Sequence, residues 1–560
     1  MRKHYFKLFI YKHSPHFAAL ALLALVLYEV SFYIFKTYRA YFNSDAAIAN
    51  VLAEEMVLSG SFFPSHWWYV NNDLWVFYKQ LLVVPWAFFD QNGYFAHAFT
   101  VFAVTLFMVF IIYRFFRSLM LSRAASVMGG VVVCIGYSPM YLRELYGEAA
   151  YTWYFIFMIA FMFIFRKLSP HVISKKTQIK AFIFFMMLLY LLTLANPIRF
   201  FVYYVVPFFG ALGLAIYFAR DSLKTFKGAV KRLLSTKKIV IFAFACGVMV
   251  LGAMKHLDLL VLLKSAGGAN NAELMPLEKL PTHVAHAFLG LLNFIGAEWN
   301  MGVRASSLEG AISLIKFFLY PFVLIIPAIH IKKAFYQMSS TERFFVLFSY
   351  VGFALIFLLY ATTSLHEHAW SARNNIRYIS PFIMMILLCN VLMWRFFSLF
   401  MKLILATCLT ISLGLSWTYI SPKEWRGIVD QRIAFVEELK SRDLKFGYAT
   451  YWDSHIYTVF SDGDVDIRPI VFNEKGVQLE KWLSSDRWYA KDATDGKVFF
   501  VTDPKNIDDF YEAIKVSNMP DFIDEFVFGE YTIFVFEKNP LYEKREKGKA
   551  LKKKRIIRAQ

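Results

Sequence analysis

The sequence predicts a polytopic α-helical membrane protein of about 11 transmembrane helices with a small C-terminal α/β extracytoplasmic domain. Composition is the first reason, since 58% of the 560 residues are hydrophobic and only 18% are charged. Soluble domains average about 45–50% apolar and about 25% charged residues. The second reason is a mean hydropathy of +0.46. The formal net charge of +19 does not indicate a nucleic-acid partner, because basic patches that bind nucleic acid lie on polar, soluble domains.

Long apolar segments recur along the first three quarters of the chain. A helix needs about 20 mostly apolar residues to cross a hydrocarbon core about 30 Å thick. The first segment is too long for a signal peptide and no small-residue cleavage site follows it, so we expect it to remain as an anchor. The predicted spans are 17–37, 97–117, 124–142, 149–165, 181–196, 200–219, 239–256, 311–330, 344–363, 378–394 and 403–420.

Lys and Arg collect in alternate loops, which predicts the side of the membrane for each loop. The N-terminus and loops such as 114–123, 166–180 and 220–238 are rich in basic residues, whereas the opposite loops hold most of the acidic ones. An odd number of spans then places the chain after residue 420 outside. We therefore expect a multi-pass protein of the cell (inner or plasma) membrane with a cytoplasmic N-terminus and an extracytoplasmic C-terminal domain.

The distribution of apolar segments predicts that the chain divides into three parts. Residues 1–420 form the transmembrane part, with large outer loops at 38–96 and 257–310. Residues 421–542 contain strand-length runs at 446–451, 498–501 and 531–536, separated by amphipathic helical stretches near 424–440 and 507–516, which is typical of a small α/β domain. Residues 543–560 form a basic tail that would face anionic lipid headgroups.

No cofactor or metal site is indicated. The four cysteines lie inside apolar runs, which favours buried thiols over disulfides or zinc ligands. The pattern His366-Glu367-His368 has its two imidazoles at i and i+2, and this spacing does not bring them to one helical face. No cofactor is therefore required, and a divalent metal stays unassigned.

The first outer loop combines an acid with many aromatic residues. Asp45 stands at the start of a helical stretch that runs to Gly60, where a carboxylate is favoured by free N–H groups and the helix dipole. The apolar side of that stretch is consistent with a helix in the membrane interface. Beyond it, Trp68 and Asp73 belong to an aromatic run with amide and acid groups. Two interpretations stay open for these aromatic residues, an interfacial belt or a surface that stacks on a sugar.

A second acidic cluster and several basic residues lie on the same predicted side. Arg143, Glu144 and Glu148 fill the tight turn before the fourth span, where a solvated turn is the alternative interpretation. Arg near a helix end can reach the interface without binding anything, but Arg is also the best side chain for holding a phosphate in a bidentate fork. The basic candidates and their neighbour are Lys79, Arg199, Arg373, Arg377 and Tyr378.

These features together resemble the GT-C glycosyltransferases, and most of all the bacterial relatives of protein O-mannosyltransferases and of the aminoarabinose transferase of lipid A. The matching features are an acid after the first span, a second acid before the fourth, Arg377-Tyr378-x-x-Pro381 before a late span, and a C-terminal outer domain. The resemblance covers roughly residues 1–420 by architecture. It implies a polyprenyl-phosphate-linked sugar donor, transfer of a hexose or pentose with inversion, and a glycan, lipid or protein acceptor on the outer face.

The resemblance also assigns roles to residues. Asp45 matches the catalytic carboxylate of the first loop, Glu148 the second acid, and Arg377 a contact to the donor phosphate. This sequence departs from the family at Asp45-Ala46, where many relatives have Asp-Glu, and at Glu148, where Asp is common. Glu144 therefore competes for the second role. The remaining candidates for substrate binding are Lys79, Arg143, Arg199, Arg373, Tyr378, Asp73 and Trp68.

Several alternatives remain beside a transferase. A lipid-linked-glycan transporter or flippase usually carries charge deep in its spans and has paired halves; here Glu29 and Asp258 are expected nearer span ends. A scaffold would need one anchor only, and a ligase that moves whole glycans is a neighbouring class. In the C-terminal domain, the stretch from Tyr451 to His455 is interpreted as aromatic core packing, with glycan contact as the alternative.

Overall fold

The computed structural model describes residues 2–74, 79–168, 174–219, 236–266, 272–297, 303–365, 375–490 and 493–541, with side chains described outside 2–13, 219 and 236–240. The chain divides into two compact units. Unit 1 comprises residues 1–36, 101–257 and 269–422, and unit 2 comprises 37–100, 258–268 and 423–560. Arg373 and the basic tail 543–560 lie outside the described residues.

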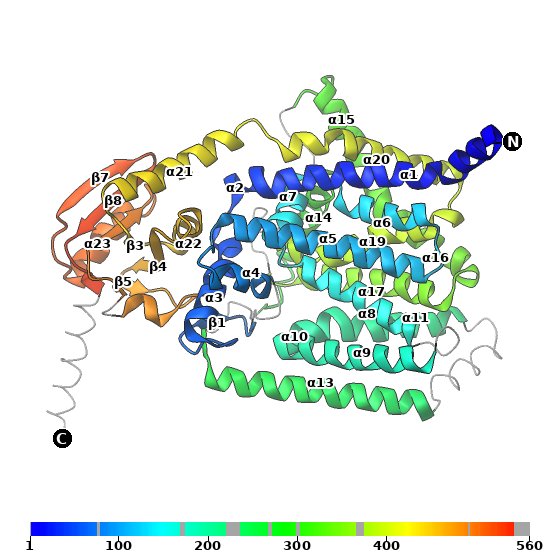
Figure 1. Cartoon of the computed structure of the whole chain (residues 1–560), viewed down its shortest axis with the longest axis horizontal. Helices are drawn as coiled ribbons and strands as arrows, with labels where there is room; N and C mark the ends of the chain where they lie inside the picture. The colour runs from blue at the N-terminus through cyan, green and yellow to red at the C-terminus, as the bar shows by residue number, and fades with distance from the viewer. Residues whose placement is uncertain are drawn as a thin grey trace. The chain divides into compact units, whose positions relative to one another are not determined.

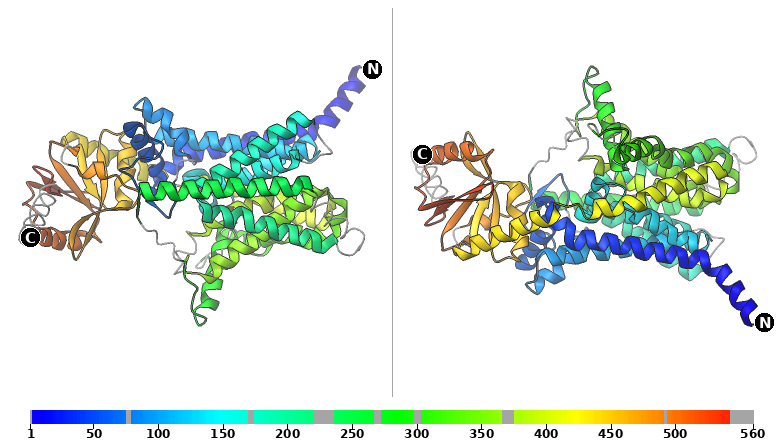
Figure 2. Two further views of the ribbon diagram at one scale, coloured as in Figure 1. Left: turned by 90° about the horizontal axis from the view of Figure 1, so that it is seen from below. Right: turned by 90° about the horizontal axis from the view of Figure 1, so that it is seen from above.

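Unit 1 is an all-helical bundle whose helices run alongside one another in all three views (Figures 1 and 2). It holds most of α5 and α13, and short π-helical and 3-10 turns adjoin several of its α-helices. Its elements are α1 (Arg2–Phe32), η1 (Tyr33–Thr37), α5 (Tyr94–Ser118), α6 (Arg123–Cys134), α7 (Pro139–Leu142), η2 (Arg143–Glu148), α8 (Thr152–Lys167), α9 (Lys175–Ala195), α10 (Pro197–Phe200), η3 (Phe201–Val205), α11 (Val206–Ala219), α13 (Thr236–Leu262), α14 (Leu280–Phe294), α15 (Leu308–Leu319), α16 (Pro321–Ala334), η4 (Phe335–Gln337), α17 (Ser340–Thr362), η5 (Ile376–Tyr378), α19 (Ser380–Met393), η6 (Trp394–Phe396) and α20 (Leu399–Ile420).

Helix α19 lies at the centre of this bundle. It packs against α6, α8, α16 and α17, and almost every one of its residues is buried. A helix that is apolar all round is expected in such a position. The outer helix α13, by contrast, exposes Phe244, Leu251 and Leu257. Exposed apolar side chains on long helices are what a hydrocarbon environment favours.

The predicted membrane architecture is confirmed, but the count of eleven spans is not. Among the described residues, eight helices are long and apolar enough to cross a membrane, or nine if the pair Arg123–Cys134 and Pro139–Glu148, bent by 105°, is counted as one span. Three predicted spans correspond to shorter helices: α6 has 12 residues, α8 has 16 and α19 has 14. The orientation of the termini, which depends on the parity of the count, stays a prediction.

Unit 2 combines a six-stranded sheet with the residues of the predicted first outer loop. The sheet order is β5-β4-β3-β6-β8-β7. In its centre β3 is parallel to β4 and to β6, with Phe446 opposite Asp466 and Val498, while the outer pairs are antiparallel. The elements are α2 (Tyr38–Tyr41), α3 (Ser44–Ser59), β1 (Trp68–Val70), α4 (Gln80–Phe88), β2 (Lys264–Ala266), α21 (Trp425–Ser441), β3 (Phe446–Ala449), α22 (Tyr451–Phe460), β4 (Asp466–Asn473), β5 (Gly476–Leu479), η7 (Asp486–Tyr489), β6 (Val498–Thr502), α23 (Ile507–Ser517), β7 (Asp524–Phe528) and β8 (Tyr531–Phe536).

Backbone hydrogen bonds join the first-loop residues to the C-terminal residues inside unit 2. The N–H of Trp68 donates to the carbonyl of Ser484 at 2.7 Å, and the N–H of Asp486 donates to the carbonyl of His66 at 3.0 Å. Strand β1 also pairs in parallel with β2. The loop 38–96 and the C-terminal domain, which the sequence treats as separate parts, therefore pack as one body.

Helix α3 is covered by protein on its apolar side. Ala49 and Ala53 pack with Val83 of α4 and with Ala96, and α22 packs against α3 as well. The side that was expected to lie in the membrane interface is therefore buried in unit 2. The helix ends at Gly60, whose φ of 61° lies in the left-handed region that favours glycine.

Arg432 of α21 ties this helix to the end of α2. Its Nη1 donates to the carbonyls of Arg39 and Phe42 at 2.8 and 2.9 Å, which are carbonyls of the kind that a helix end leaves without an intrahelical partner. We expect Arg432→Ala to lower the free energy of unfolding of unit 2 by about 2 kcal/mol, because two charge-assisted hydrogen bonds are lost. Arg426→Ala on the same helix, where the side chain is exposed, is the matched control. The effect is measured as the resistance of the C-terminal residues to a protease at increasing temperature. Equal unfolding temperatures for the Arg432 and Arg426 variants would contradict the prediction.

Candidate functional site

Unit 1 brings together Glu148 and Arg377, two residues that the sequence singled out. Nη1 of Arg377 donates to Oε2 of Glu148 at 3.1 Å, with the side chains 25% and 5% exposed. Glu148 ends η2, a π-helical turn, and Arg377 lies in η5 directly before α19. π-Helical turns occur frequently at functional sites, and both residues stand at helix ends, where a charge can reach polar surroundings.

Arg143 and Glu144 extend this pair. Nη2 of Arg143 donates to Oε1 of Glu144 at 2.9 Å, and the Glu144 side chain is 1% exposed. Glu144 also interacts electrostatically with Glu148 and Arg377. The turn ends at Ala149 with φ of 53°, a left-handed conformation that is disfavoured for residues other than glycine and that tends to occur at functional positions.

Arg199 joins the same group through tyrosines that the sequence analysis did not select. Its Nη1 donates to the hydroxyl of Tyr151 at 3.4 Å, and the Tyr151 ring packs edge-on against Tyr378 with centroids 5.4 Å apart. The hydroxyl of Tyr203 donates to the carbonyl of Tyr378 at 2.6 Å. Tyr151 and Tyr203 lie within apolar segments of the sequence, so no local signal distinguishes them from tyrosines that only pack in the core.

We call Arg143, Glu144, Glu148, Arg199 and Arg377 the Arg–Glu cluster. Its three guanidinium groups and two carboxylates leave an excess of one positive charge. Buried carboxylates paired with Arg in this way keep the guanidinium groups oriented. The cluster is therefore suited to receive an anionic group that two or more guanidinium forks can hold.

Unit 2 contains Asp45, the proposed acid of the first loop, and its environment differs from the expectation. Asn43 is the N-cap of α3 and accepts from the N–H of Ala46 at 2.9 Å. Asp45 lies in the first turn, and its Oδ1 accepts from the hydroxyl of Tyr451 at 2.9 Å. The N-cap is therefore Asn43 and not Asp45, while Asp45 keeps the first-turn position that the helix dipole favours for a carboxylate.

Tyr451 is held from several sides. Its carbonyl accepts from the hydroxyls of Ser44 at 2.5 Å and Ser454 at 3.0 Å. Its ring meets His455 with centroids 5.7 Å apart, and His455 in turn meets Trp488 at 5.5 Å. Core packing is thus confirmed for Tyr451, Ser454 and His455, which are buried. It fails for Trp452, which is exposed.

The other first-loop candidates take largely structural positions. Lys79 is buried and its Nζ donates to the carbonyl of Ala46 at 3.3 Å, which places an ammonium group at the first turn of α3. Asp73 is fully buried. Nε1 of Trp68 donates to Asp486 at 2.7 Å, and Asp486 also pairs with Lys264. Trp68 therefore helps to join the first loop to the C-terminal residues.

Comparison with known proteins bears on the fold. No family model matches the chain, and no curated protein sequence matches it. Among solved structures, ArnT from Cupriavidus metallidurans in its apo state is similar over 92% of this chain and 97% of its own, with 12% identity and a TM-score of 0.50. The same protein bound to undecaprenyl phosphate gives 10% identity and a TM-score of 0.53 over the same shares. An oligosaccharyltransferase from Archaeoglobus fulgidus covers 90% of this chain and 71% of its own, with 10% identity and a TM-score of 0.40.

The chain shares the fold of ArnT. The resemblance that the sequence predicted is thereby confirmed at the level of the fold. The similarity spans nearly the whole chain, so it includes the C-terminal residues as well as the membrane helices.

A charged residue does lie deep within a span, contrary to expectation. Glu29 falls near the middle of the apolar helix Ser14–Tyr41. Its Oε2 accepts from the hydroxyl of Ser416 on α20 at 2.8 Å, and its side chain is buried. The carboxyl group therefore joins α1 to α20, which explains how the helix accommodates it.

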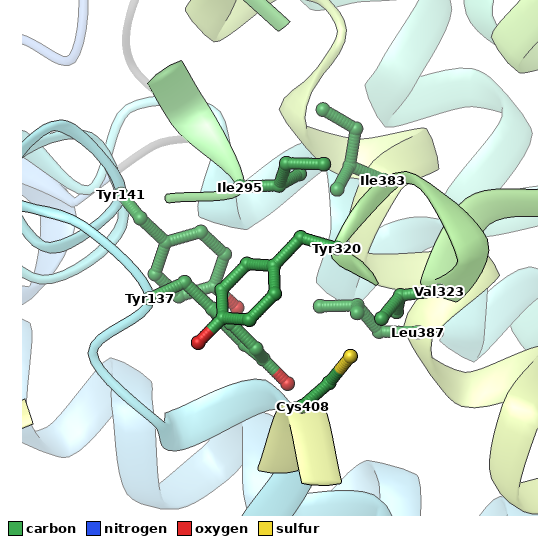
Figure 3. Close-up of a pocket in the computed structure, with 8 residues that line it drawn as sticks. All are labelled: Tyr137, Tyr141, Ile295, Tyr320, Val323, Ile383, Leu387 and Cys408. Carbon is green, nitrogen blue, oxygen red and sulfur yellow. The ribbon is translucent and has the colours of Figure 1, made fainter. Parts of the chain in front are cut away.

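In the part of the chain that the structure describes, neither a metal site nor the apolar pocket of unit 1 coincides with the charged candidates. No group of three or more His, Cys, Asp or Glu within the described ranges is placed to hold a metal ion. A pocket in unit 1 is lined by Tyr137, Tyr141, Tyr320 and Cys408 together with Ile295, Val323, Ile383 and Leu387. Figure 3 shows its three tyrosine rings gathered opposite the aliphatic side chains. The lining is apolar, so this pocket does not offer the phosphate site that the charged residues predict.

His455 gives a pH-dependent test of the packing behind Tyr451. Burial, with a smaller contribution from Arg468, lowers the pKa of His455 to about 3, whereas an unfolded histidine titrates near 6.5. The unfolded state therefore binds the proton first, and stability falls as pH decreases below about 6.5. We expect the wild type to lose about 2 kcal/mol more than His455→Phe between pH 6.5 and 5. Unfolding of both proteins monitored over this range checks the difference, and parallel curves would refute it.

Proposed function

We propose that this protein is a membrane glycosyltransferase that moves a sugar from a polyprenyl-phosphate donor to an acceptor hydroxyl outside the cytoplasm, with inversion at the anomeric carbon. The observation that carries the proposal is the Arg–Glu cluster, above all the pair of Glu148 and Arg377. The GT-C fold supports it, as does the similarity to ArnT, whose structure has been solved with undecaprenyl phosphate bound.

In this proposal the Arg–Glu cluster binds the donor phosphate. Guanidinium groups form bidentate hydrogen bonds with phosphate oxygens, and such bonds are stronger in a partly dehydrated site than in water. Glu148 orients Arg377, and Glu144 orients Arg143. Between the two candidate acids, Glu148 is the better choice for the second role because it holds the guanidinium that the family resemblance assigns to the phosphate.

Asp45 acts as the general base. The acceptor hydroxyl transfers its proton to the Asp45 carboxylate while its oxygen forms a bond to the anomeric carbon. The bond from that carbon to the phosphate oxygen breaks, and its electron pair leaves with the polyprenyl phosphate. Correctly placed general-base catalysis contributes about 10²–10⁴-fold. The hydroxyl of Tyr451 donates to Oδ1 of Asp45 and so helps to hold the carboxylate in one orientation.

Asp45→Asn tests the base. The amide keeps the size of the side chain but cannot accept the acceptor's proton, so we expect transfer to fall by at least about 100-fold. Asp430→Asn, at an exposed position of α21, is the matched control and should retain full activity. The measurement is release of polyprenyl phosphate from a synthetic polyprenyl-phosphate sugar by protein in nanodiscs. Full activity of the Asp45 variant would remove this residue from the mechanism.

Arg377→Gln tests the phosphate contact. We expect the affinity for undecaprenyl phosphate to fall by about tenfold or more, since a charge-assisted bond to phosphate is lost. Arg395→Gln is a matched control because Arg395 also pairs with a buried glutamate, Glu342, at 2.7 Å. Binding is followed by native mass spectrometry of the protein in nanodiscs.

Two outcomes of these assays would count against the proposal. Equal loss of affinity in the Arg377 and Arg395 variants would indicate a general effect of charge. A wild-type protein that moves the polyprenyl-phosphate sugar between leaflets and leaves it chemically intact would be a transporter.

A further inference from the structure

Trp452 is the most exposed tryptophan for which the structure describes a side chain. Its side chain is 59% exposed, whereas the next are Trp394 and Trp417 at 42% each. In the same unit Trp67 and Trp488 are buried. A large indole ring gains free energy from burial, so its exposure in a packed domain is a cost that a binding role would explain.

The position of Trp452 in the sheet also indicates a binding surface. Strand β3 has β4 on one side and β6 on the other, and all three strands are parallel. The chain leaves β3 for β4 and later returns to β6, so the connections diverge at β3. In open α/β sheets, ligands bind outside the carboxyl ends of strands at such a point. Trp452 follows β3 by three residues, in the first turn of α22.

The first turn of α22 is held rigidly. Oδ2 of Asp453 accepts from the hydroxyl of Thr450 at 2.8 Å, and its Oδ1 accepts from the hydroxyl of Tyr531 at 3.2 Å. The Trp452 ring meets the Tyr451 ring edge-on with centroids 5.2 Å apart. A fixed aromatic surface loses little entropy when it binds a ligand.

Trp452 is connected to the proposed base through Tyr451. Tyr451 packs against the Trp452 ring and donates its hydroxyl proton to a hydrogen bond with Asp45. Tyr451 therefore lies in contact with both the indole ring and the Asp45 carboxylate. These contacts lie within unit 2, so they do not depend on any other part of the chain.

We propose that Trp452 is the platform on which a sugar ring of the acceptor stacks, so that the acceptor of this enzyme is a carbohydrate. The inference rests on the proposed function and narrows its acceptor class. The C–H face of a pyranose ring packs on an indole, while its hydroxyl groups remain at the rim of the ring. One rim hydroxyl would then be presented to Asp45. A serine or threonine hydroxyl of a protein acceptor has no such face to place on the ring.

Binding is tested without any donor. 5-Fluorotryptophan is incorporated at Trp452 alone in the full-length protein in nanodiscs, and its ¹⁹F resonance is followed while methyl pyranosides are added. We expect a saturable shift at millimolar concentrations. The same label at Trp394, which is also exposed, should not shift. Two results would overturn the platform: no shift at Trp452 with any pyranoside, or strong broadening of the Trp452 resonance by nitroxide-labelled lipids, which would place the ring in the membrane.

Kinetics separates failure of the platform from failure of the enzyme. With a synthetic polyprenyl-phosphate sugar and envelope glycan as acceptor, Trp452→Ala should raise the acceptor KM about tenfold and leave the donor KM unchanged. Trp452→Phe should restore most of the affinity, and Trp394→Ala should match the wild type. If the wild type transfers sugar and Trp452→Ala behaves like Trp394→Ala, the platform is wrong and the transferase stands. If the wild type transfers no sugar while the ¹⁹F shift saturates, the platform stands and the transferase proposal is wrong.

Discussion

The absence of water inside a bilayer is the constraint on which this chain's organisation depends. Backbone polar groups must be satisfied within helices there, and charges are tolerated chiefly at helix ends or in pairs. The functional candidates follow this rule: Glu148 ends a π-helical turn, Arg377 precedes α19, and Arg199 lies in the first turn after Pro197. Glu29 is the informative exception, since it lies mid-span and is accommodated by a hydrogen bond to Ser416.

The same constraint explains why the Arg–Glu cluster is built from paired charges. An isolated buried guanidinium or carboxylate would be costly, whereas breaking a formed pair leaves one charge uncompensated. In the proposed function, a phosphate at Arg377 or Arg143 meets partly buried donors that Glu148 and Glu144 already orient. Part of the cost of ordering the arginines is thus met on folding, which leaves more of the interaction energy for binding. In the proposed function, the formal excess of one positive charge favours an anion at this cluster.

Features of the fold that depend on neighbouring residues could be predicted from the sequence, whereas contacts between residues far apart in the chain could not. The strands β3, β6 and β8 were predictable because short apolar runs are a local pattern, whereas Glu148 and Arg377 were selected through their place near helix ends and the family resemblance. The strands β4, β5 and β7 and the helix α22 were missed, and the run at 446–451 was assigned wholly to a strand although the chain turns into α22 at Tyr451. The bond between Tyr451 and Asp45 spans 406 positions, and no local pattern encodes such a contact. Composition likewise cannot separate the buried Tyr451 from the exposed Trp452.

The contacts between distant segments of unit 2 indicate what the C-terminal domain contributes to the first loop. Asp45 lies in the first turn of α3, and the C-terminal domain reaches it through Tyr451. Tyr451 fixes it, Ser44 and Ser454 fix Tyr451, and His455 and Trp488 support the ring from behind. Catalytic groups need such supporting contacts to hold a productive geometry. A domain that only bound an acceptor would not need to donate a hydrogen bond to a residue of the first loop, so this network supports the proposal that unit 2 positions Asp45 as well as the acceptor.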